Sequence, residues 1–266
     1  MFLNEKNIKE ELATNIIGKK IFFLEKVDST NTYARKLVQR GFGEGIVIIA
    51  DHQTEGRGRF GKKWHSPAGT GAWMSVILNP VGNKDSLINI NYICALSVVE
   101  AIYNLIYVKG EIKWPNDILM NKKKVGGILS ELVKFENKKE FIIAGIGINI
   151  NQSYEDFPSD LREIATSLKI ISGIELVREK IIINILQFLE KYYILSFESG
   201  TDFIFKEWLK WVTTVGKKIR IATSEKYFEG VAESIKPDGK LLLRNNLNEI
   251  KEVTPGDIIQ VIEYIN

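Results

Sequence analysis

The stretch Gly56-Arg57-Gly58-Arg59-Phe60-Gly61-Lys62-Lys63-Trp64 places three glycines and four cations directly before an indole side chain. Glycine lets backbone N–H groups approach a ligand that a Cβ atom would hold away, and arginine supplies a planar fork of donors that matches carboxylate or phosphate. The apolar run 46–50 before it is typical of a strand, and loops held by strands often carry binding sites. The segment therefore predicts an anion-binding loop.

Two other interpretations fit the loop when it is taken alone. The spacing Gly56-x-Gly58-x-x-Gly61 matches the dinucleotide fingerprint, but that motif needs a helix to start within the glycines. Residues 64–71 are too rich in glycine and proline to propagate a helix, so we reject a dinucleotide site. A solvated or RNA-contacting basic loop remains as the second alternative.

Composition limits the class of protein. The balance of 36 Lys and Arg against 33 Asp and Glu gives a net charge of only +3, which is unlike a dedicated nucleic-acid-binding protein. The single cysteine, Cys94, lies in an apolar run and excludes a disulfide framework. No signal-peptide pattern and no apolar run of about 18 residues stand out, so we expect a soluble, cytoplasmic protein with no membrane segment.

Hydrophobic periodicity predicts an α+β fold with one large and one small domain, residues 1–214 and 215–266. The expected helix over residues 32–40 has Ser29, Thr30 and Asn31 as candidate capping residues. The other expected helices cover 86–107, 177–197 and 201–212. Strands are expected at 21–24, 46–50, 72–78, 112–114, 118–120, 127–132 and 141–149.

The pattern of the sequence changes after residue 215, from long helices to short strands separated by turns. Short strands are expected at 217–221, 226–233, 240–243, 249–253 and 258–264, with Pro-Asp-Gly and Pro-Gly-Asp turns between them. About fifty residues of that pattern predict a small β-barrel.

Further motifs follow in order along the chain. They are Asp28-Ser29-Thr30-Asn31-Thr32, Lys113-Trp114-Pro115-Asn116-Asp117, Lys124-Val125-Gly126-Gly127, Gly145-Ile146-Gly147-Ile148-Asn149 and Ile164-Ala165-Thr166-Ser167-Leu168. With the glycine-rich stretch, they make the sequence resemble the biotin protein ligases from about residue 22 to its end. The resemblance implies a class II synthetase-like catalytic domain with a mixed sheet, followed by an SH3-like barrel.

The resemblance also implies an activity. Such enzymes use ATP, with Mg²⁺, to convert biotin into biotinyl-5′-AMP, and then transfer biotin to a lysine of a biotin carboxyl carrier protein. Joining a carboxylate to a phosphate brings two anions together, so the site needs cations and N–H donors. The catalytic candidates are Arg59, Lys124 and Asp117. The biotin-binding candidates are Ser29, Thr30, Asn31, Gln53, Arg57, Gly58, Arg59, Lys124 and Gly127. The ATP-binding candidates are Arg57, Arg59, Lys62, Trp64, Asn116, Lys124 and Asn149.

Several of these residues have a plain structural alternative. Lys124 also fits a solvated lysine turn, Trp64 a core position, and Asn149 a turn at the end of a strand. Asp117 has three open roles: a metal-associated carboxylate, an orienting partner for Lys124, or the acceptor of the carrier lysine's proton. No metal site is assigned, because the histidines are not paired with cysteines at ligand spacing.

The sequence departs from the family pattern at two loop positions. Phe60 stands where a second arginine is common and offers an apolar cover for a ligand, while Lys62 keeps a charge but lacks the arginine fork. Only about 20 residues precede the first expected strand, too few for the helix-turn-helix domain of bifunctional relatives, so we expect no specific DNA binding. Monomer and homodimer both remain open.

Two alternative functions are kept. A lipoate or octanoate ligase or transferase has a related fold, but Gln53 and the Ser-Thr-Asn cluster suit a polar ureido ring better than an apolar acyl chain. A nucleic-acid-binding module would use the basic loop and the barrel, and the near-neutral charge disfavours it.

Overall fold

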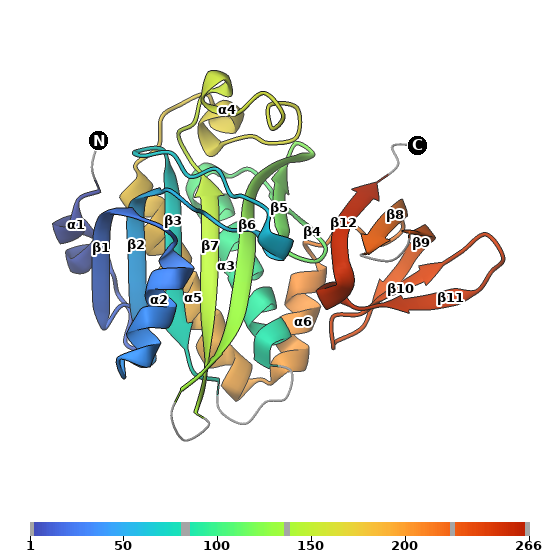
Figure 1. Ribbon diagram of the computed structural model, residues 1–266, viewed down its shortest axis with the longest axis horizontal. Helices are drawn as coiled ribbons and strands as arrows, with labels where there is room; N and C mark the ends of the chain where they lie inside the picture. Colours follow the sequence, from blue (N-terminus) through green and yellow to red (C-terminus); the bar gives the residue numbers. More distant parts are fainter. Residues whose placement is uncertain (1–2, 81–85, 136–138, 224–226, 264–266) are drawn as a thin grey trace.

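The computed structural model of the protein describes residues 3–80, 86–135, 139–223 and 227–263. These residues form two β-sheets, a seven-stranded sheet flanked by helices and a five-stranded sheet near the C-terminus (Figure 1). The predicted α+β class, a mixed sheet followed by a small all-β unit, is confirmed. The domain boundary at residues 214 and 215 stays a prediction.

The large sheet is mixed. Its strands are β1 (Lys20–Val27), β2 (Ile46–Gln53), β3 (Gly71–Leu78), β4 (Glu111–Lys113), β5 (Asp117–Met120), β6 (Lys123–Lys134) and β7 (Glu140–Asn149). Their order is β1-β2-β3-β7-β6-β5-β4, with β1 and β2 parallel and every other neighbouring pair antiparallel. The central strands β2, β3 and β7 are buried along most of their length, as expected for strands with both faces covered.

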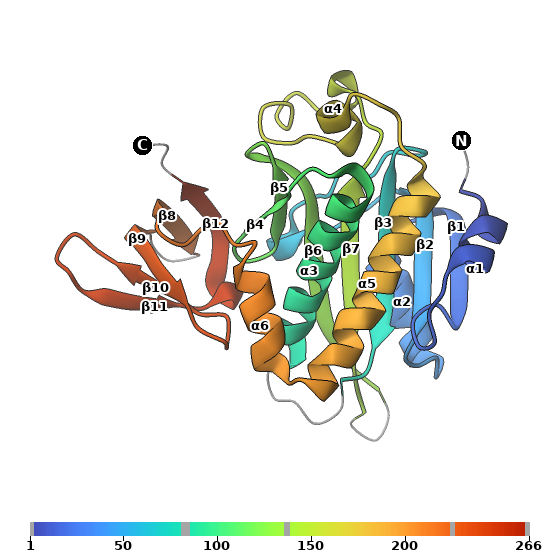
Figure 2. The same cartoon turned by 180° about the vertical axis from the view of Figure 1, so that it is seen from behind.

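Helices cover the two faces of this sheet. Helix α2 (Thr30–Gln39) packs on one face, and α3 (Ser86–Ile106), α5 (Arg178–Glu198) and α6 (Thr201–Leu209) form a layer on the other (Figure 2). Within that layer, the rings of Tyr92 and Trp208 lie 4.3 Å apart between centroids, joining α3 to α6. The four expected long helices are all present, although α6 ends three residues early.

Helix α3 is long and apolar enough to be a candidate membrane span, which was not expected from the sequence. Over Leu87–Ile106 its mean hydropathy is 1.3, so by length and composition it is a candidate membrane span. In the structure, 67% of this segment is buried against the rest of the protein. The apolar residues of α3 are therefore used inside the fold, as in a core helix.

The start of α2 differs from the prediction. The helix begins at Thr30, and Ser29 occupies the N-cap position without a side-chain capping bond. The side chains of Thr30 and Asn31 instead form hydrogen bonds with neighbouring strands. The N-cap therefore falls within the predicted cluster, at Ser29, but without a side-chain capping bond, while the Thr30 and Asn31 side chains have tertiary partners.

Two short helices have no hydrophobic period in the sequence, although the Ala-Thr-Ser-Leu segment resembles a helix segment of the family at the start of the second. Helix α1 (Glu5–Glu11) is capped by the Asn4 side chain, and α4 (Leu168–Ser172) is capped by Ser167. Both are too short for a hydrophobic period to be visible, so the capping residues were the only local signal.

The C-terminal sheet contains β8 (Lys218–Thr223), β9 (Tyr227–Ile235), β10 (Leu241–Arg244), β11 (Ile250–Val253) and β12 (Ile258–Glu263). Its order is β11-β10-β9-β8-β12 and its pairs are antiparallel, which confirms the five expected strands. The expected ends at residues 226 and 264 lie outside the described residues. Among those described, β11 and β12 do not pair to close a barrel. The Trp114 indole, after β4, donates to the carbonyl of Gly239 at 3.0 Å, which joins this sheet to the large one.

A buried ion pair ties α5 to β2. The Arg178 guanidinium lies 2.6 Å from the Asp51 carboxylate, and the two residues are 4% and 7% exposed. Asp51 lies two residues before Gln53, where β2 reaches the glycine-rich stretch. The pair therefore fixes the strand that leads into the predicted site.

We expect Arg178→Ala to lower the free energy of unfolding by about 3–5 kcal/mol, because it leaves the Asp51 carboxylate buried without its counter-charge. The matched control is Arg244→Ala, which breaks a 2.7 Å pair with Glu233 at the surface. That change should cost about 1 kcal/mol or less. Urea denaturation measures both variants, and equal losses would contradict the assignment.

Candidate active site

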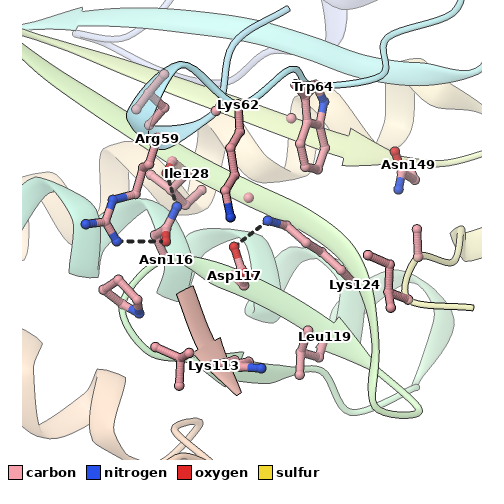
Figure 3. A pocket seen from close by; sticks show the side chains of 18 of the residues that line it. Arg59, Lys62, Trp64, Lys113, Asn116, Asp117, Leu119, Lys124, Ile128 and Asn149 are labelled. Atoms are coloured by element: carbon pink, nitrogen blue, oxygen red, sulfur yellow. Dashed lines mark hydrogen bonds and ion pairs between the residues drawn. The ribbon is translucent and has the colours of Figure 1, made fainter. Parts of the chain in front are cut away.

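A cavity of about 870 Å³ is lined by the glycine-rich stretch, by β4 to β7 and by residues of β8 and β12. Figure 3 shows Arg59, Lys62 and Trp64 reaching into it from one side, opposite Asp117 and Lys124. The cavity wall contains every predicted site residue: Ser29, Thr30, Asn31, Gln53, Arg57, Gly58, Arg59, Lys62, Trp64, Asn116, Asp117, Lys124, Gly127 and Asn149. Their roles in binding and catalysis stay predictions.

The glycine loop, residues 56–64, folds back on itself. The backbone N–H of Gly58 donates to the carbonyl of Lys62 at 2.7 Å, and that of Trp64 donates to the carbonyl of Gly56 at 2.8 Å. At the tip, Phe60 adopts a positive φ of 53°, a conformation that bulky residues rarely take. Phe60 is 51% exposed and does not line the cavity in this structure.

Arg59 connects the loop to both sheets. Its guanidinium donates to Asn116 Oδ1 at 3.4 Å and to the backbone carbonyl of Pro255, which precedes β12. The Asn116 amide in turn donates to the Ile128 carbonyl at 2.8 Å. Burial lowers the pKa of Arg59, and the charge of Asp117 opposes that shift. Arg59 is thus a partly desolvated cation that neutral oxygens hold in place.

Lys124 and Asp117 form an ion pair of 2.5 Å across the neighbouring strands β6 and β5. The Lys124 ammonium also lies 5.3 Å from the centroid of the Trp64 ring. The backbone of Lys124 exchanges hydrogen bonds with Ile164 and Thr166, so the Ala-Thr-Ser-Leu segment holds this end of β6. Lys124 is therefore part of a strand in the cavity wall rather than of a solvated turn.

A row of polar side chains runs beneath the cavity, which we call the polar row: Asn31, Ser75, Thr30, Gln53 and Ser66. The Ser75 hydroxyl lies 2.6 Å from Asn31 Oδ1 and 2.7 Å from Thr30 Oγ1. Gln53 accepts from the Thr30 backbone N–H at 2.9 Å and donates to Ser66 at 3.0 Å. Ser75, which is fully buried, was not among the predicted site residues, although a lone serine in the otherwise apolar run 72–78 was an available signal.

Two glycines of β7 leave room for these groups. An added Cβ at Gly145 would lie 2.3 Å from Asn31 Oδ1, and one at Gly147 would lie 2.6 Å from Trp64 Nε1. Contacts that short would force a shift in the neighbouring groups. The Gly-Ile-Gly-Ile-Asn motif is therefore required for close packing over the strand, whatever the ligand.

Asn149 ends β7 and is 5% exposed. Its amide donates to the Thr166 carbonyl at 3.0 Å, and its oxygen accepts from Gln152 at 3.1 Å. The residue thus anchors the segment before α4 while also lining the cavity. Contact with adenine stays a prediction.

Part of the wall had no signal in the sequence. Lys217, Lys218, Ile258 and Val261 line the cavity from the C-terminal sheet, far from the motifs in the chain. Across the described ranges, no three His, Cys, Asp or Glu side chains cluster as a metal site.

Comparison with known proteins identifies the family. The biotin/lipoate A/B protein ligase family matches residues 23–149. The bifunctional ligase/repressor BirA of Bacillus subtilis (strain 168) is 37% identical over 256 residues, which cover 96% of this chain and 78% of that protein. The chain belongs to the biotin protein ligase family. The prediction of this family from the sequence is confirmed, as is biotin ligase activity for the chain.

Other biotin protein ligases match over most of their length. The biotin--[acetyl-CoA-carboxylase] ligase of Mycobacterium tuberculosis is 27% identical over 268 residues, covering 97% of this chain and 96% of the relative. A biotin protein ligase from Aquifex aeolicus, solved in complex with biotin and ATP, has a TM-score of 0.80 at 28% identity. That alignment covers 92% of this chain and 100% of the Aquifex chain, so the whole fold is shared.

We expect Gly147→Ala to displace the Trp64 ring from the cavity wall. Overpacking of this kind destabilises the fold by about 1–3 kcal/mol. Because Trp64 is a predicted ATP-binding residue, its displacement should also raise the KM for ATP roughly tenfold. Gly43→Ala is the matched control, because its added Cβ would meet only the Phe141 ring at ordinary contact distances of 3.8 Å and more. Steady-state kinetics of biotin-dependent AMP formation measures both, and an unchanged KM for ATP in Gly147→Ala would contradict the predicted role of Trp64 in ATP binding.

Proposed function

We propose that the chain catalyses two successive reactions of biotin. In the first, a carboxylate oxygen of biotin attacks the α-phosphorus of ATP, the bond to the bridging oxygen breaks, and pyrophosphate leaves. In the second, the ε-amine of a carrier lysine attacks the carbonyl carbon of biotinyl-5′-AMP, AMP leaves and the amine loses a proton. The observation that carries the proposal is that the cations and the polar row share one cavity.

The cations act on the charge that develops between the two anions. Arg59 and Lys124 supply positive charge in a partly water-excluded wall, where electrostatic stabilisation of a transition state is strongest. Of the three roles left open for Asp117, the 2.5 Å ion pair supports the orienting role, since it fixes the Lys124 ammonium. Arg57 and Lys62 add donors for the carboxylate and phosphate oxygens from the glycine loop.

The nucleotide end of the cavity is assigned to Trp64, Asn116 and Asn149. Mg²⁺ would enter with the triphosphate, and the Asp117 carboxylate, besides orienting Lys124, offers oxygen of the kind that this ion prefers, so the residues present fit it. When bound, Mg²⁺ would neutralise charge on the departing pyrophosphate. The protein's own part is to orient the adenylate and to exclude water.

The biotin end is assigned to the polar row together with Ser29, Gly58 and Gly127. A ureido ring requires both hydrogen-bond donors and acceptors, and Thr30, Asn31 and Gln53 provide both kinds in the cavity wall. A lipoyl or octanoyl chain has no donor or acceptor at this end to hydrogen-bond these polar groups, whereas the ureido ring has both, and this difference disfavours the acyl substrates. The polar row therefore supports biotin over the acyl alternatives.

The proposed acceptor is the lysine-bearing domain of a biotin carboxyl carrier protein. We place the reaction in the cytoplasm, where carboxylases and ATP are available. The enzyme acts as a monomer or a homodimer. Specific DNA binding is not included in the proposal.

Biotin-dependent exchange of pyrophosphate into ATP tests the first reaction directly. We expect the purified chain with ATP and Mg²⁺ to show exchange with biotin and little with lipoate or octanoate, because only biotin satisfies the polar row. Mass spectrometry should detect biotinyl-5′-AMP bound to the protein. Exchange with an acyl substrate but none with biotin would transfer the assignment to the lipoate or octanoate class.

We expect Arg59→Gly to release the adenylate roughly 10 to 100-fold faster, because it removes charge-assisted hydrogen bonds and adds backbone freedom to the loop. Released adenylate is a reactive mixed anhydride, so it should label lysines of a bystander protein such as serum albumin. Dissociation rates and bystander labelling are compared with wild type and with Arg220→Gly, a surface change in the C-terminal sheet. An Arg59→Gly variant that forms adenylate but neither releases it faster nor labels albumin would contradict this role.

A further inference from the structure

Glu131 stands behind the cavity wall and is not one of the residues that line the cavity. It lies on β6, and its carboxylate accepts hydrogen bonds from three side chains. These are Asn31 Nδ2 at 2.7 Å, Arg35 at 3.2 Å and Arg57 at 3.3 Å. The Glu131 side chain is 22% exposed, so these partners largely replace water around it. One carboxylate thus joins α2, the glycine loop and β6.

This carboxylate fixes the orientation of the Asn31 amide. A carboxylate flanked by two arginines accepts hydrogen bonds and does not donate them, so Asn31 must turn its Nδ2 group toward Glu131. The same nitrogen donates to the Leu129 carbonyl at 3.1 Å. Asn31 Oδ1 therefore faces the Ser75 hydroxyl, 2.6 Å away, and accepts from it.

The orientation of the Asn31 amide determines the next hydrogen bonds of the polar row, because each hydroxyl group has only one proton to donate. The Ser75 proton goes to Asn31, so the 2.7 Å contact between the two hydroxyls takes the Thr30 proton. The longer contact of 3.1 Å from Thr30 Oγ1 to Gln53 Oε1 is then left without a proton. Gln53 Oε1 is then held by the Thr30 backbone N–H at 2.9 Å. The donors of Asn31, Ser75 and Thr30 Oγ1 therefore point toward Glu131. Beyond them the direction reverses, because the Thr30 backbone N–H donates to Gln53 and the Gln53 amide donates to Ser66.

We propose that Glu131 is a positioning residue that orients the Asn31, Ser75 and Thr30 side chains of the polar row and holds the Arg57 guanidinium, and thereby selects a cyclic urea. A urea ring combines two N–H donors with one carbonyl acceptor. A guanidino ring, in which an imine replaces that carbonyl, donates where the urea accepts. The inference rests on the proposed function, since it concerns how biotin is recognised in the same cavity.

The test compares biotin with 2-iminobiotin as substrates for wild type and Glu131→Gln. Glutamine has nearly the shape of glutamate but both donates and accepts, so Asn31 is free to turn over in the variant. We expect the KM for biotin to rise roughly tenfold and the preference for biotin over 2-iminobiotin, as a ratio of kcat/KM, to fall roughly tenfold. The KM for ATP should rise less than the KM for biotin, because only Arg57, which loses its ion pair with Glu131, also reaches the phosphate oxygens.

Two further variants separate this role from a general structural one. Glu140→Gln is the matched control, because Glu140 pairs with Lys134 at the surface of the neighbouring strand, and its substitution should change no kinetic parameter beyond about twofold. Glu131→Asp keeps an acceptor-only group with a shorter reach. It should therefore keep the preference for biotin even where its KM rises.

The inference is overturned if Glu131→Gln keeps the wild-type preference, or if Glu131→Asp loses it to the same extent as Glu131→Gln. It is also overturned if the KM values for biotin and ATP rise together while the preference is unchanged, since that marks a loss of structure. A wild-type enzyme that fails to use biotin at all would instead overturn the proposed function and this inference with it.

Discussion

The site depends on a stretch of β7 that carries no side chains on its cavity face. Gly145 and Gly147 leave the backbone bare, and Asn31 and Trp64 occupy the space where their Cβ atoms would be. The position of Trp64 fixes the end of the glycine loop, and the Lys124 ammonium lies beside the same ring. The absence of side chains at these two positions of an otherwise apolar, buried strand therefore shapes the cavity.

The cations of the cavity are compensated in different ways. Lys124 has a carboxylate partner in Asp117 and Arg57 has one in Glu131, whereas the direct partners of Arg59 are the neutral oxygens of Asn116 and Pro255. Neutral acceptors hold a cation more weakly than a charged group does, so Arg59 exchanges them for an anionic ligand at the lowest cost. Lys124 must share its charge between Asp117 and any phosphate. Arg59 is therefore the cation best suited to leave its partners in the protein and bind the ligand.

Much of the site could be predicted from the sequence because its motifs are local. The glycine loop, the Gly-Ile-Gly-Ile-Asn strand end and the Lys124 motif each combine residue types whose chemistry is evident within a few positions. The long helices and most strands followed from their hydrophobic period. These features depend on neighbours in the chain, so the sequence displays them directly.

Other features depend on partners that are distant in the chain. Ser29, Thr30 and Asn31 looked like a helix cap, but Asn31 is held by Glu131, one hundred positions away, and Thr30 by Gln53 and Ser75. The wall formed by Lys217 and Lys218 had no signal at all, since nothing local places the C-terminal sheet beside the glycine loop. Local chemistry was ambiguous wherever two sets of partners could satisfy the same polar atoms.

The contact between Arg59 and Pro255 has a consequence for how this family can diverge. The acceptor is a main-chain carbonyl, which every amino acid provides, so the identity of the residue at that position is free to drift. The path of the chain is not free, because an insertion or deletion between β11 and β12 would move the carbonyl away from the guanidinium. For this contact alone, the length of the segment before β12 therefore matters more than the side chain at position 255.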